Sequence, residues 1–228
     1  MKQLTHSQTI PRVLQNKPTL VNPRKAWENF KGTGQVREAL LPAQKYLCSY
    51  CEIELADIPL GLGSHIEHIE SKTLNPHLTF VFTNLMLSCF QTGGELKGTE
   101  EDTGSVSCGH APLKRKNRYN AALFIKPTET DCERYFFYEL DGRIVPHPEL
   151  DDTERRRAEH TIEVLNLNCR RLTRQRAEMI REGLEIVADL SDAPEALAHF
   201  IDAEISEVAT NKMRAFHTTR LQYFQDLA

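Results

Sequence analysis

Apolar side chains recur at helical spacing near the start of the chain and again over its last third. In residues 26–44 the recurring apolar positions are interrupted by Gly32 and Gly34, which predicts two short helices. Acidic residues after Leu150 suit a helix start, although Thr153 is followed three positions later by Arg156 and not by an acid. The helices expected in this last third run from 152 to about 166, from 172 to about 190, and onward from Pro194.

The segment Gly63–Lys72 is read as a strand, in which successive side chains point to alternate faces. His65 and Glu67 then share one face, while Ile66 and His68 share the other. At the end of such a strand, a carboxylate can hold a cation while the neighbouring imidazole faces a substrate.

The residues after this strand are expected to complete a hairpin and to begin a helix. Residues 73–83 are predicted to hold the turn and the second strand, and Asn84–Cys89 the first turn of the helix. A second hairpin is predicted over 134–145, with a two-residue turn at Asp141–Gly142. Its aromatic residues could stack on bases, but packing against the core is favoured.

These patterns predict an α+β protein in three parts. Residues 1–25 are polar and contain three prolines, so they are read as an extended N-terminal arm. Residues 26–150 are expected to form the main domain, and residues 151–228 a helical lobe. The acidic, glycine-rich stretch 95–104 is expected to be a mobile loop inserted into the main domain.

Composition narrows the class of protein. The chain has 228 residues, 40% of them hydrophobic, which is enough for one sizeable domain. A net charge of -4 argues against coating nucleic acid through bulk electrostatics, but a local basic run at 108–118 suits phosphate contacts by Lys114, Arg115 and Lys116. No signal peptide or membrane-spanning stretch is apparent, so a cytoplasmic location is expected.

Four of the six cysteines predict a zinc site. Cys48 and Cys51 form a Cys-x-x-Cys pair, and Cys89 and Cys108 follow it. Three disulfides are the alternative, but a reducing compartment disfavours them, and the spacing favours tetrahedral thiolate zinc. Cys132 and Cys169 have no partner close in sequence and are interpreted as buried free thiols, and Trp27 as a core anchor.

Glu67 and His68 suggest phosphodiester hydrolysis assisted by a divalent ion. Magnesium or manganese prefers oxygen ligands, so Glu67 suits the metal and His68 suits the general base. The amide of Asn84 would either accept a hydrogen bond from the other ring nitrogen of His68 or orient the backbone of the turn. Taken singly, each residue also has a structural interpretation. A histidine on an ordinary strand is more often structural than catalytic, and Glu67 could simply pair with Lys72.

The order of these residues resembles the HNH (ββα-metal) nucleases with a structural zinc, and most closely the PtuB component of Septu anti-phage systems, which also occurs with retrons. The segments that carry the resemblance are Trp27, Gln44–Glu52, His65–His68, Asn84, Cys89, Cys108 and Leu165–Asn168. The resemblance implies a zinc-stapled ββα-metal core with a β-hairpin and a C-terminal helical lobe. It also implies that Glu67 binds the catalytic metal, that His68 is the base, and that His110 completes the metal site. Many HNH proteins have this last residue directly after the final cysteine, where Gly109 stands here.

The resemblance further implies partners. Septu nucleases act with an ABC/SMC-like ATPase of the PtuA type, and a retron version would add a reverse transcriptase and its RNA–DNA hybrid. This sequence has no Gly-x-x-x-x-Gly-Lys loop, so nucleotide hydrolysis is expected from another subunit. The alternative function is a non-catalytic, zinc-stabilised adaptor that binds the ATPase or nucleic acid; such an adaptor would need the cysteines but not Glu67 and His68.

Overall fold

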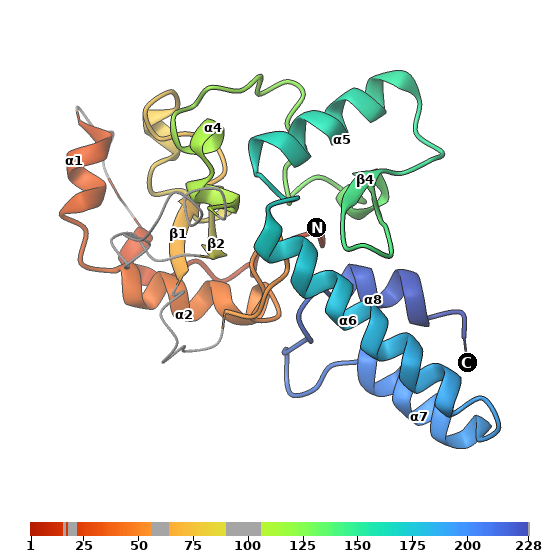
Figure 1. Cartoon of the computed structure of the whole chain (residues 1–228). Helices are drawn as coiled ribbons and strands as arrows, with labels where there is room; N and C mark the ends of the chain where they lie inside the picture. The colour runs from red at the N-terminus through yellow and green to blue at the C-terminus, as the bar shows by residue number, and fades with distance from the viewer. Residues whose placement is uncertain (16, 18–21, 56–63, 90–105, 228) are drawn as a thin grey trace.

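The described residues form two small antiparallel sheets set among helices, as the α+β prediction requires (Figure 1). The computed structural model describes residues 1–15, 17, 22–55, 64–89 and 106–227. The acidic stretch 95–104 lies outside the described residues, as do residues 58–63, which precede the first strand.

The first hairpin pairs β1 (Ser64–His68) with β2 (Leu85–Cys89), so that Ser64 lies opposite Cys89 and His68 opposite Leu85. The strand at Glu67 and His68 is therefore confirmed. The predictions of a second strand within 73–83 and of a helix from Asn84 are wrong. All five β2 residues are buried, and a strand covered on both faces reads as a continuous apolar run that periodicity cannot distinguish from a helix.

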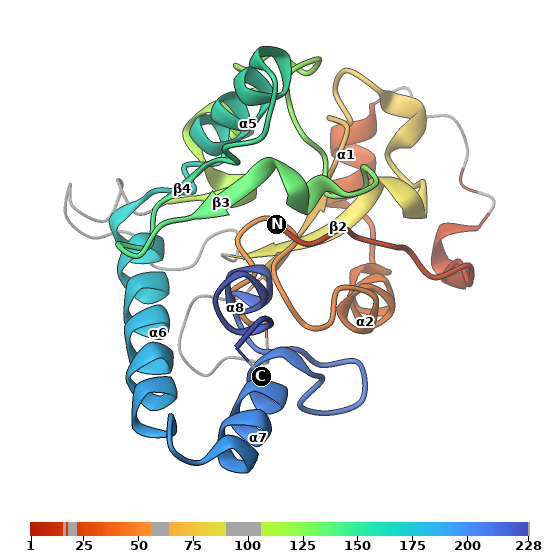
Figure 2. The same cartoon turned by 90° about the vertical axis from the view of Figure 1, so that its right-hand side faces the viewer.

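The N-terminal residues are part of what covers β2. Met1, Leu4 and Leu14 are buried in the core, and the only regular structure before α1 in the described residues is a 3-10 turn at Arg12–Leu14. The ring Nε2 of His6 lies 2.7 Å from the carbonyl oxygen of Leu85. This stretch runs beside β2 in Figure 2, which explains why no polar face is left on that strand.

Two short helices precede the hairpin, as predicted. They are α1 (Pro23–Glu28) and α2 (Thr33–Ala43). The side chain of Asn22 caps α1 by accepting a hydrogen bond from the backbone N–H of Lys25 at 2.9 Å, and Pro23 takes the first helical position, where no N–H is needed. Gly32 precedes α2 and ends the break between the helices, whereas Gly34 lies inside α2.

The second hairpin consists of β3 (Phe136–Tyr138) and β4 (Ile144–Pro146). Its loop is one residue longer than predicted, because the backbone N–H of Glu139 still donates to the carbonyl of Arg143 at 2.8 Å and Gly142 takes a positive φ of 81°. Phe136 and Tyr138 are buried, so these aromatic side chains pack in the core, as the sequence favoured.

Four helices form the last third of the chain: α5 (Asp152–Val164), α6 (Arg170–Asp189), α7 (Pro194–Ile205) and α8 (His217–Phe224). The first three confirm the predicted helices, and α8 was not anticipated. The capping box of α5 also differs from the sequence reading: its N-cap is Asp151, whose carboxylate accepts from the N–H of Glu154 while the Glu154 side chain accepts from the N–H of Asp151.

The connection between α5 and α6 ties several parts of the core together. The carbonyl of Leu165 accepts a hydrogen bond from the N–H of Cys108 at 2.7 Å. The amide of Asn168 accepts from the N–H of Ile144 at 2.7 Å and donates to its carbonyl at 2.8 Å. Leu165 and Leu167 are fully buried. The segment that carried part of the resemblance thus joins the last cysteine to the second hairpin.

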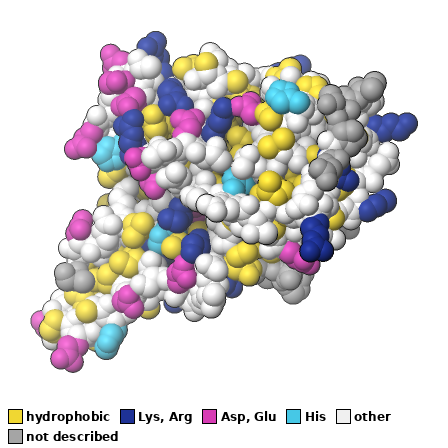
Figure 3. Space-filling view, turned by 180° about the vertical axis from the view of Figure 1, so that it is seen from behind, with side chains coloured by type: hydrophobic (Ala, Val, Ile, Leu, Met, Phe, Trp, Pro, Cys, Tyr) yellow, Lys and Arg dark blue, Asp and Glu magenta, His cyan; other side chains and the backbone are white. Residues whose placement is uncertain are grey.

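Several arginines in and beside the helical region are paired with acids. Arg157 lies 2.7 Å from Glu129, and Arg134 bonds Glu154 on α5. Figure 3 shows Lys and Arg side chains interspersed with Asp and Glu over this part of the surface. Such mixed charge favours a solvated, ion-paired face over a continuous phosphate-binding one. Among the described residues, no helix combines the length and apolarity that a membrane crossing needs.

Candidate metal centre and adjoining cleft

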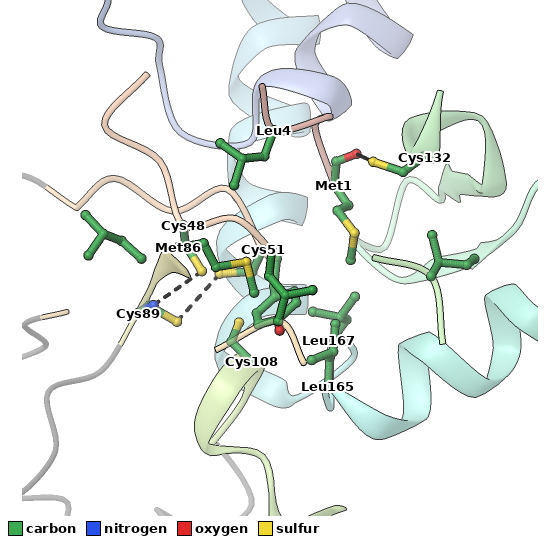
Figure 4. Packing of buried hydrophobic residues seen from close by; sticks show 14 of the residues in the cluster. Met1, Leu4, Cys48, Cys51, Met86, Cys89, Cys108, Cys132, Leu165 and Leu167 are labelled. Atoms are coloured by element: carbon green, nitrogen blue, oxygen red, sulfur yellow. Dashed lines mark hydrogen bonds between the residues drawn. The ribbon is translucent and has the colours of Figure 1, made fainter. Parts of the chain in front are cut away.

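Four cysteines converge at the centre of the core (Figure 4). The sulfurs of Cys48, Cys51, Cys89 and Cys108 all lie within 4.8 Å of one another, and all four residues are buried. The sulfurs of Cys51 and Cys89 are 3.7 Å apart. A disulfide requires about 2.05 Å, whereas two ligands of a tetrahedral zinc with Zn–S bonds of about 2.3 Å lie about 3.8 Å apart. This cluster can therefore hold a metal such as zinc.

Backbone geometry turns the four sulfurs toward one point. The chain turns back on itself after the Cys48–Cys51 pair. The N–H of Cys48 donates to the carbonyl of Ile53 at 2.9 Å, and Glu52, within this turn, takes a positive φ of 60°. The N–H of Cys89 points at the sulfur of Cys48, 3.3 Å away. An amide donor of this kind stabilises a thiolate, which is the form that binds a metal.

A cationic side chain lies close to the cysteines. Arg171, near the start of α6, donates to the hydroxyl of Ser107 at 3.0 Å. Burial alone would lower the pKa of its guanidinium, but the nearby thiols of Cys51 and Cys89 outweigh burial and raise it. A metal bound by four thiolates carries net negative charge, so a charged arginine beside it offsets part of that charge.

Beside this cluster, β1 opens onto a cleft of about 550 Å³. Glu67 and His68 line it from β1, His110 lines it from the turn after Cys108, and Trp27 from α1. The remaining lining residues include Arg24, Glu28, His65, Ile66, Ser71, Lys72, Thr73, Gly109, Lys114, Arg115 and Asn117. The hairpin thus connects the cleft to the cysteine cluster, because Cys89 ends β2 opposite the start of β1.

His68 is held in one tautomer and stays uncharged near neutral pH. Its Nε2 lies 3.0 Å from the carbonyl oxygen of Thr79, and because a carbonyl only accepts, Nε2 carries the proton and Nδ1 keeps the lone pair. Burial, with Lys72 adding to it, lowers the pKa of His68 to about 4. The ring of Trp27 packs edge-on against it at a centroid distance of 4.5 Å. Trp27 is only partly buried, so this core anchor also forms a wall of the cleft.

Asn84 lies behind the cleft and fastens the loop that positions His68. Its Oδ1 accepts from the N–H of Glu70 at 2.8 Å, and its Nδ2 donates to the carbonyls of Glu70 and Leu78 at 3.1 Å each. Of the two arrangements considered from sequence, the structure has the second: the carbonyl of Thr79, and not the amide of Asn84, accepts from the ring of His68. Asn84 acts on His68 through the backbone of this loop.

The carboxylate of Glu67 lies between two nitrogen groups. Its Oε1 is 3.2 Å from the ammonium of Lys114, and its Oε2 is 3.2 Å from Nε2 of His65. Burial alone would raise the pKa of Glu67, but the Lys114 ammonium and the His65 hydrogen bond outweigh it, so the pKa lies below its ordinary value. Glu67 thus forms its ion pair with Lys114 and not with Lys72, the alternative considered from the sequence.

The predicted phosphate-contact residues are placed at different depths. Lys114 is buried at 4% exposure, with its ammonium on Glu67 and 3.3 Å from the hydroxyl of Tyr119. Arg115, the last residue of the short helix α4 (Pro112–Arg115), is exposed and lines the cleft. Lys116, the next residue, is exposed outside the cleft lining.

His110 enters the cleft although Gly109 separates it from the last cysteine. Its ring meets the ring of His65 edge-on at a centroid distance of 4.0 Å. Burial, followed by the effect of His65, lowers the pKa of His110 to about 4, so the ring is neutral near pH 7. Gly109 stands where any side chain would collide with its neighbours, because an added Cβ would lie 2.7 Å from both Oε2 of Glu67 and Nε2 of His65.

Neutral imidazole nitrogens and an ionised carboxylate are suitable metal donors, so Glu67 and His110 fit the catalytic cation that the sequence predicts. The space kept open at Gly109 supports this fit, because the backbone approaches the donor atoms without covering them. His65 was not singled out from sequence, although its place on the same face of β1 as Glu67 was the available signal.

Replacing Gly109 with alanine is expected to displace the Glu67 and His65 side chains. Gly109 has an ordinary φ, so the cost is one of space and not of backbone conformation. Overpacking of this kind typically destabilises by about 1–3 kcal/mol, and we expect a lower thermal midpoint together with weaker divalent-ion binding. Gly34→Ala is the matched control, because nothing lies within 4 Å of its added Cβ. Equal behaviour of the two variants would contradict the role given to Gly109.

Two curated proteins are similar to this chain. One is the "Retron Vc95 putative HNH endonuclease" of Vibrio cholerae serotype O1 biovar El Tor, 29% identical over 160 residues that cover 70% of this chain and 70% of that protein. The other is the "Retron Ec83 putative HNH endonuclease" of Escherichia coli, 29% identical over 190 residues that cover 70% of this chain and 72% of that protein. No protein-family model matches the sequence.

Proposed function

We propose that this chain is a metal-dependent HNH endonuclease that hydrolyses nucleic-acid phosphodiester bonds within an anti-phage defence complex. The observation that carries the proposal is the convergence of Glu67, His68 and His110 on one cleft beside a buried four-cysteine cluster. The similarity to two proteins named as retron HNH endonucleases supports it independently. In this proposal the β1–β2 hairpin and the turn at Cys108–Arg115 form a zinc-stapled ββα-metal core.

The division into an arm at 1–25, a nuclease domain at 26–150 and a helical lobe at 151–228 belongs to the same proposal. Under it, the nuclease domain would hold both metal sites, and the lobe and the exposed residues of the arm would dock partners, since Met1, Leu4 and Leu14 of the arm are buried in the core. Cys48, Cys51, Cys89 and Cys108 would hold the structural zinc.

His68 would act as the general base. With its Nε2 proton directed to Thr79, the Nδ1 lone pair is left to take a proton from the attacking water. Asn84 contributes by fixing the loop that carries the Thr79 carbonyl. A magnesium or manganese ion held by Glu67 and His110 would, when bound, neutralise charge on the phosphate and the leaving oxygen.

Nucleic acid would approach across the exposed cations around the cleft. Arg24 and Arg115 line its rim, and Lys116 lies just beyond it. These are few charges on a chain of net charge -4, and phosphate affinity grows with the number of cations brought to the backbone. We therefore propose that the isolated chain binds nucleic acid weakly and that a partner supplies further contacts.

The proposed partner is an ABC/SMC-like ATPase of the PtuA type, together with a retron reverse transcriptase and its RNA–DNA hybrid where the system includes a retron. Support comes from the sequence resemblance to PtuB and from the word "retron" in the names of both relatives. Cytoplasmic location is proposed with these partners.

The experiment that tests the proposed function compares the purified chain with the chain co-purified with its neighbouring gene products. Each sample is given labelled single- and double-stranded DNA and RNA, with magnesium or manganese and with EDTA. We expect divalent-dependent cleavage, faster in the complex than in the isolated chain. Binding without any cleavage in either sample would favour the adaptor, and cleavage by the isolated chain that the partners do not change would contradict the proposed activation.

A further inference from the structure

We infer that His65 is a third protein ligand of the metal in the cleft, so that the site is made of two imidazoles and one carboxylate and takes a transition-metal dication in preference to magnesium. The inference deepens the proposed function and rests on it. Its basis is the arrangement of His65, Glu67, His110 and Gly109, combined with the ligand preferences of divalent ions.

The strand places His65 beside Glu67. Both side chains leave the same face of β1, two residues apart, and Nε2 of His65 reaches to 3.2 Å from Oε2 of Glu67. A nitrogen and an oxygen at this separation are as close as two donors on adjacent corners of one coordination sphere, since metal–donor bonds of about 2.1 Å set neighbouring donors about 3 Å apart. The hydrogen bond seen here would then give way to two metal bonds.

The turn after Cys108 brings the second imidazole to the same point. The rings of His65 and His110 meet edge-on with centroids 4.0 Å apart. Imidazole nitrogens are good ligands for divalent transition metals, and two rings this close can bind one cation together. His65, Glu67 and His110 therefore supply donors from two segments that are more than forty positions apart along the chain.

Lys114 decides which oxygen of Glu67 faces this point. Its buried ammonium holds Oε1 at 3.2 Å and also contacts the Tyr119 hydroxyl at 3.3 Å, so one end of the carboxylate is fixed. Oε2 remains on the side of His65. Lys114 is thus a positioning residue for a one-oxygen contact from Glu67.

Gly109 keeps the remaining side open. A Cβ there would lie 2.7 Å from Nε2 of His65 and 2.7 Å from Oε2 of Glu67, the same two atoms inferred to bind the ion. The backbone of Gly109 is itself fixed, because its N–H donates to the hydroxyl of Ser88 on β2 at 3.1 Å. The absence of a side chain at this point leaves space at the donor atoms for a cation and its remaining ligands.

This donor set selects the class of ion. Magnesium demands an octahedron of oxygens and gives up its water reluctantly, whereas imidazole nitrogens bind manganese, iron, cobalt and nickel progressively more tightly along the divalent series. A site of two imidazoles and one carboxylate should therefore bind manganese more tightly than magnesium. The competing explanation is that His65 only orients Glu67 by a hydrogen bond.

The test measures manganese binding directly, by electron paramagnetic resonance of the free ion, on protein whose cysteine site is already filled with zinc. Wild type, His65→Ala, His65→Gln, Glu67→Gln and His110→Ala are titrated, with His77→Ala as the control because His77 is exposed outside the cleft lining. Thermal melting of each variant checks that it is folded. Magnesium is then added as a competitor to the wild-type complex with manganese.

We expect His65→Ala and His65→Gln to weaken manganese binding by more than roughly 100-fold, because loss of a residue that only orients a ligand typically costs about 10- to 100-fold, and His77→Ala to bind like wild type. Magnesium should displace manganese only in large excess. Binding weakened by no more than roughly 100-fold in both His65 variants, with binding lost in Glu67→Gln, would overturn the inference and leave the nuclease proposal standing. If the His65 variants lose manganese binding as expected but the wild-type complex cleaves no nucleic acid, the metal site is supported and the nuclease proposal is contradicted.

Discussion

Cys51→Ser is expected to abolish zinc binding and to unfold the core of the protein. The residue lies with Cys48 in a buried cluster whose other two members come from β2 and from the turn at Cys108, so the metal joins segments that the local sequence does not hold together. Structural zinc contributes about 10–16 kcal/mol of apparent binding free energy in small domains, as much as the whole stability of an ordinary domain, about 5–15 kcal/mol. Elemental analysis and far-UV circular dichroism measure the two effects.

Cys169→Ser provides the matched control for this experiment. Cys169 is also buried, but it lies outside the four-cysteine cluster and is the N-cap of α6, without a side-chain capping bond. Serine is a preferred N-cap residue, so the change should alter stability by no more than about 1 kcal/mol and leave zinc in place. A Cys51→Ser protein with wild-type melting temperature would show that the cysteine cluster does not stabilise the fold through a metal.

The second large effect is expected at His68. His68→Ala should lower the rate of nucleic-acid cleavage by roughly 10²-fold or more, the range for loss of a general base. The fold and the zinc content should remain, because within the part of the chain that the structure describes the ring bonds the Thr79 carbonyl and packs on Trp27 in the cleft wall. Single-turnover cleavage by the complete complex separates this chemical step from substrate binding.

His199→Ala is the control for the cleavage assay, since His199 lies exposed on α7, away from the cleft. It should cut at the wild-type rate. If His68→Ala cuts as fast as His199→Ala does, the base is another residue and the Nδ1 argument fails.

The sequence predicted the structure well where a residue type has few possible structural roles, as cysteine and glycine do. A Cys-x-x-Cys pair with two later cysteines predicts a tetrahedral site, and the four sulfurs do converge. Reading His65–His68 as a strand predicted β1, and residues from both of its faces line the cleft. The glycine at 142 and the flanking aromatic residues predicted the second hairpin, although not the length of its loop.

The sequence was misleading where tertiary contacts cover both faces of an element. β2 is buried on every residue, so Leu85–Cys89 carries no periodic signal, and the N-terminal residues that cover it come from more than seventy positions away. The position of His110 could not be derived either, because the reason for Gly109 is its contact with Glu67 and His65 across the hairpin. Asn84 shows the same limit: its three hydrogen bonds depend on how the loop from Glu70 folds back.

The central claim is that the cleft of Glu67, His68 and His110 cuts nucleic acid with the help of a bound divalent ion. The most direct measurement is manganese-dependent cleavage of end-labelled DNA and RNA by the purified complex containing either the wild-type chain or Glu67→Gln, a change that keeps the side-chain shape but removes the charge. The account predicts discrete products from the wild-type complex only when manganese is present, and a loss of roughly 10²-fold or more in Glu67→Gln. Equal cleavage by the two complexes, or unchanged cleavage by the wild type in EDTA, would contradict it.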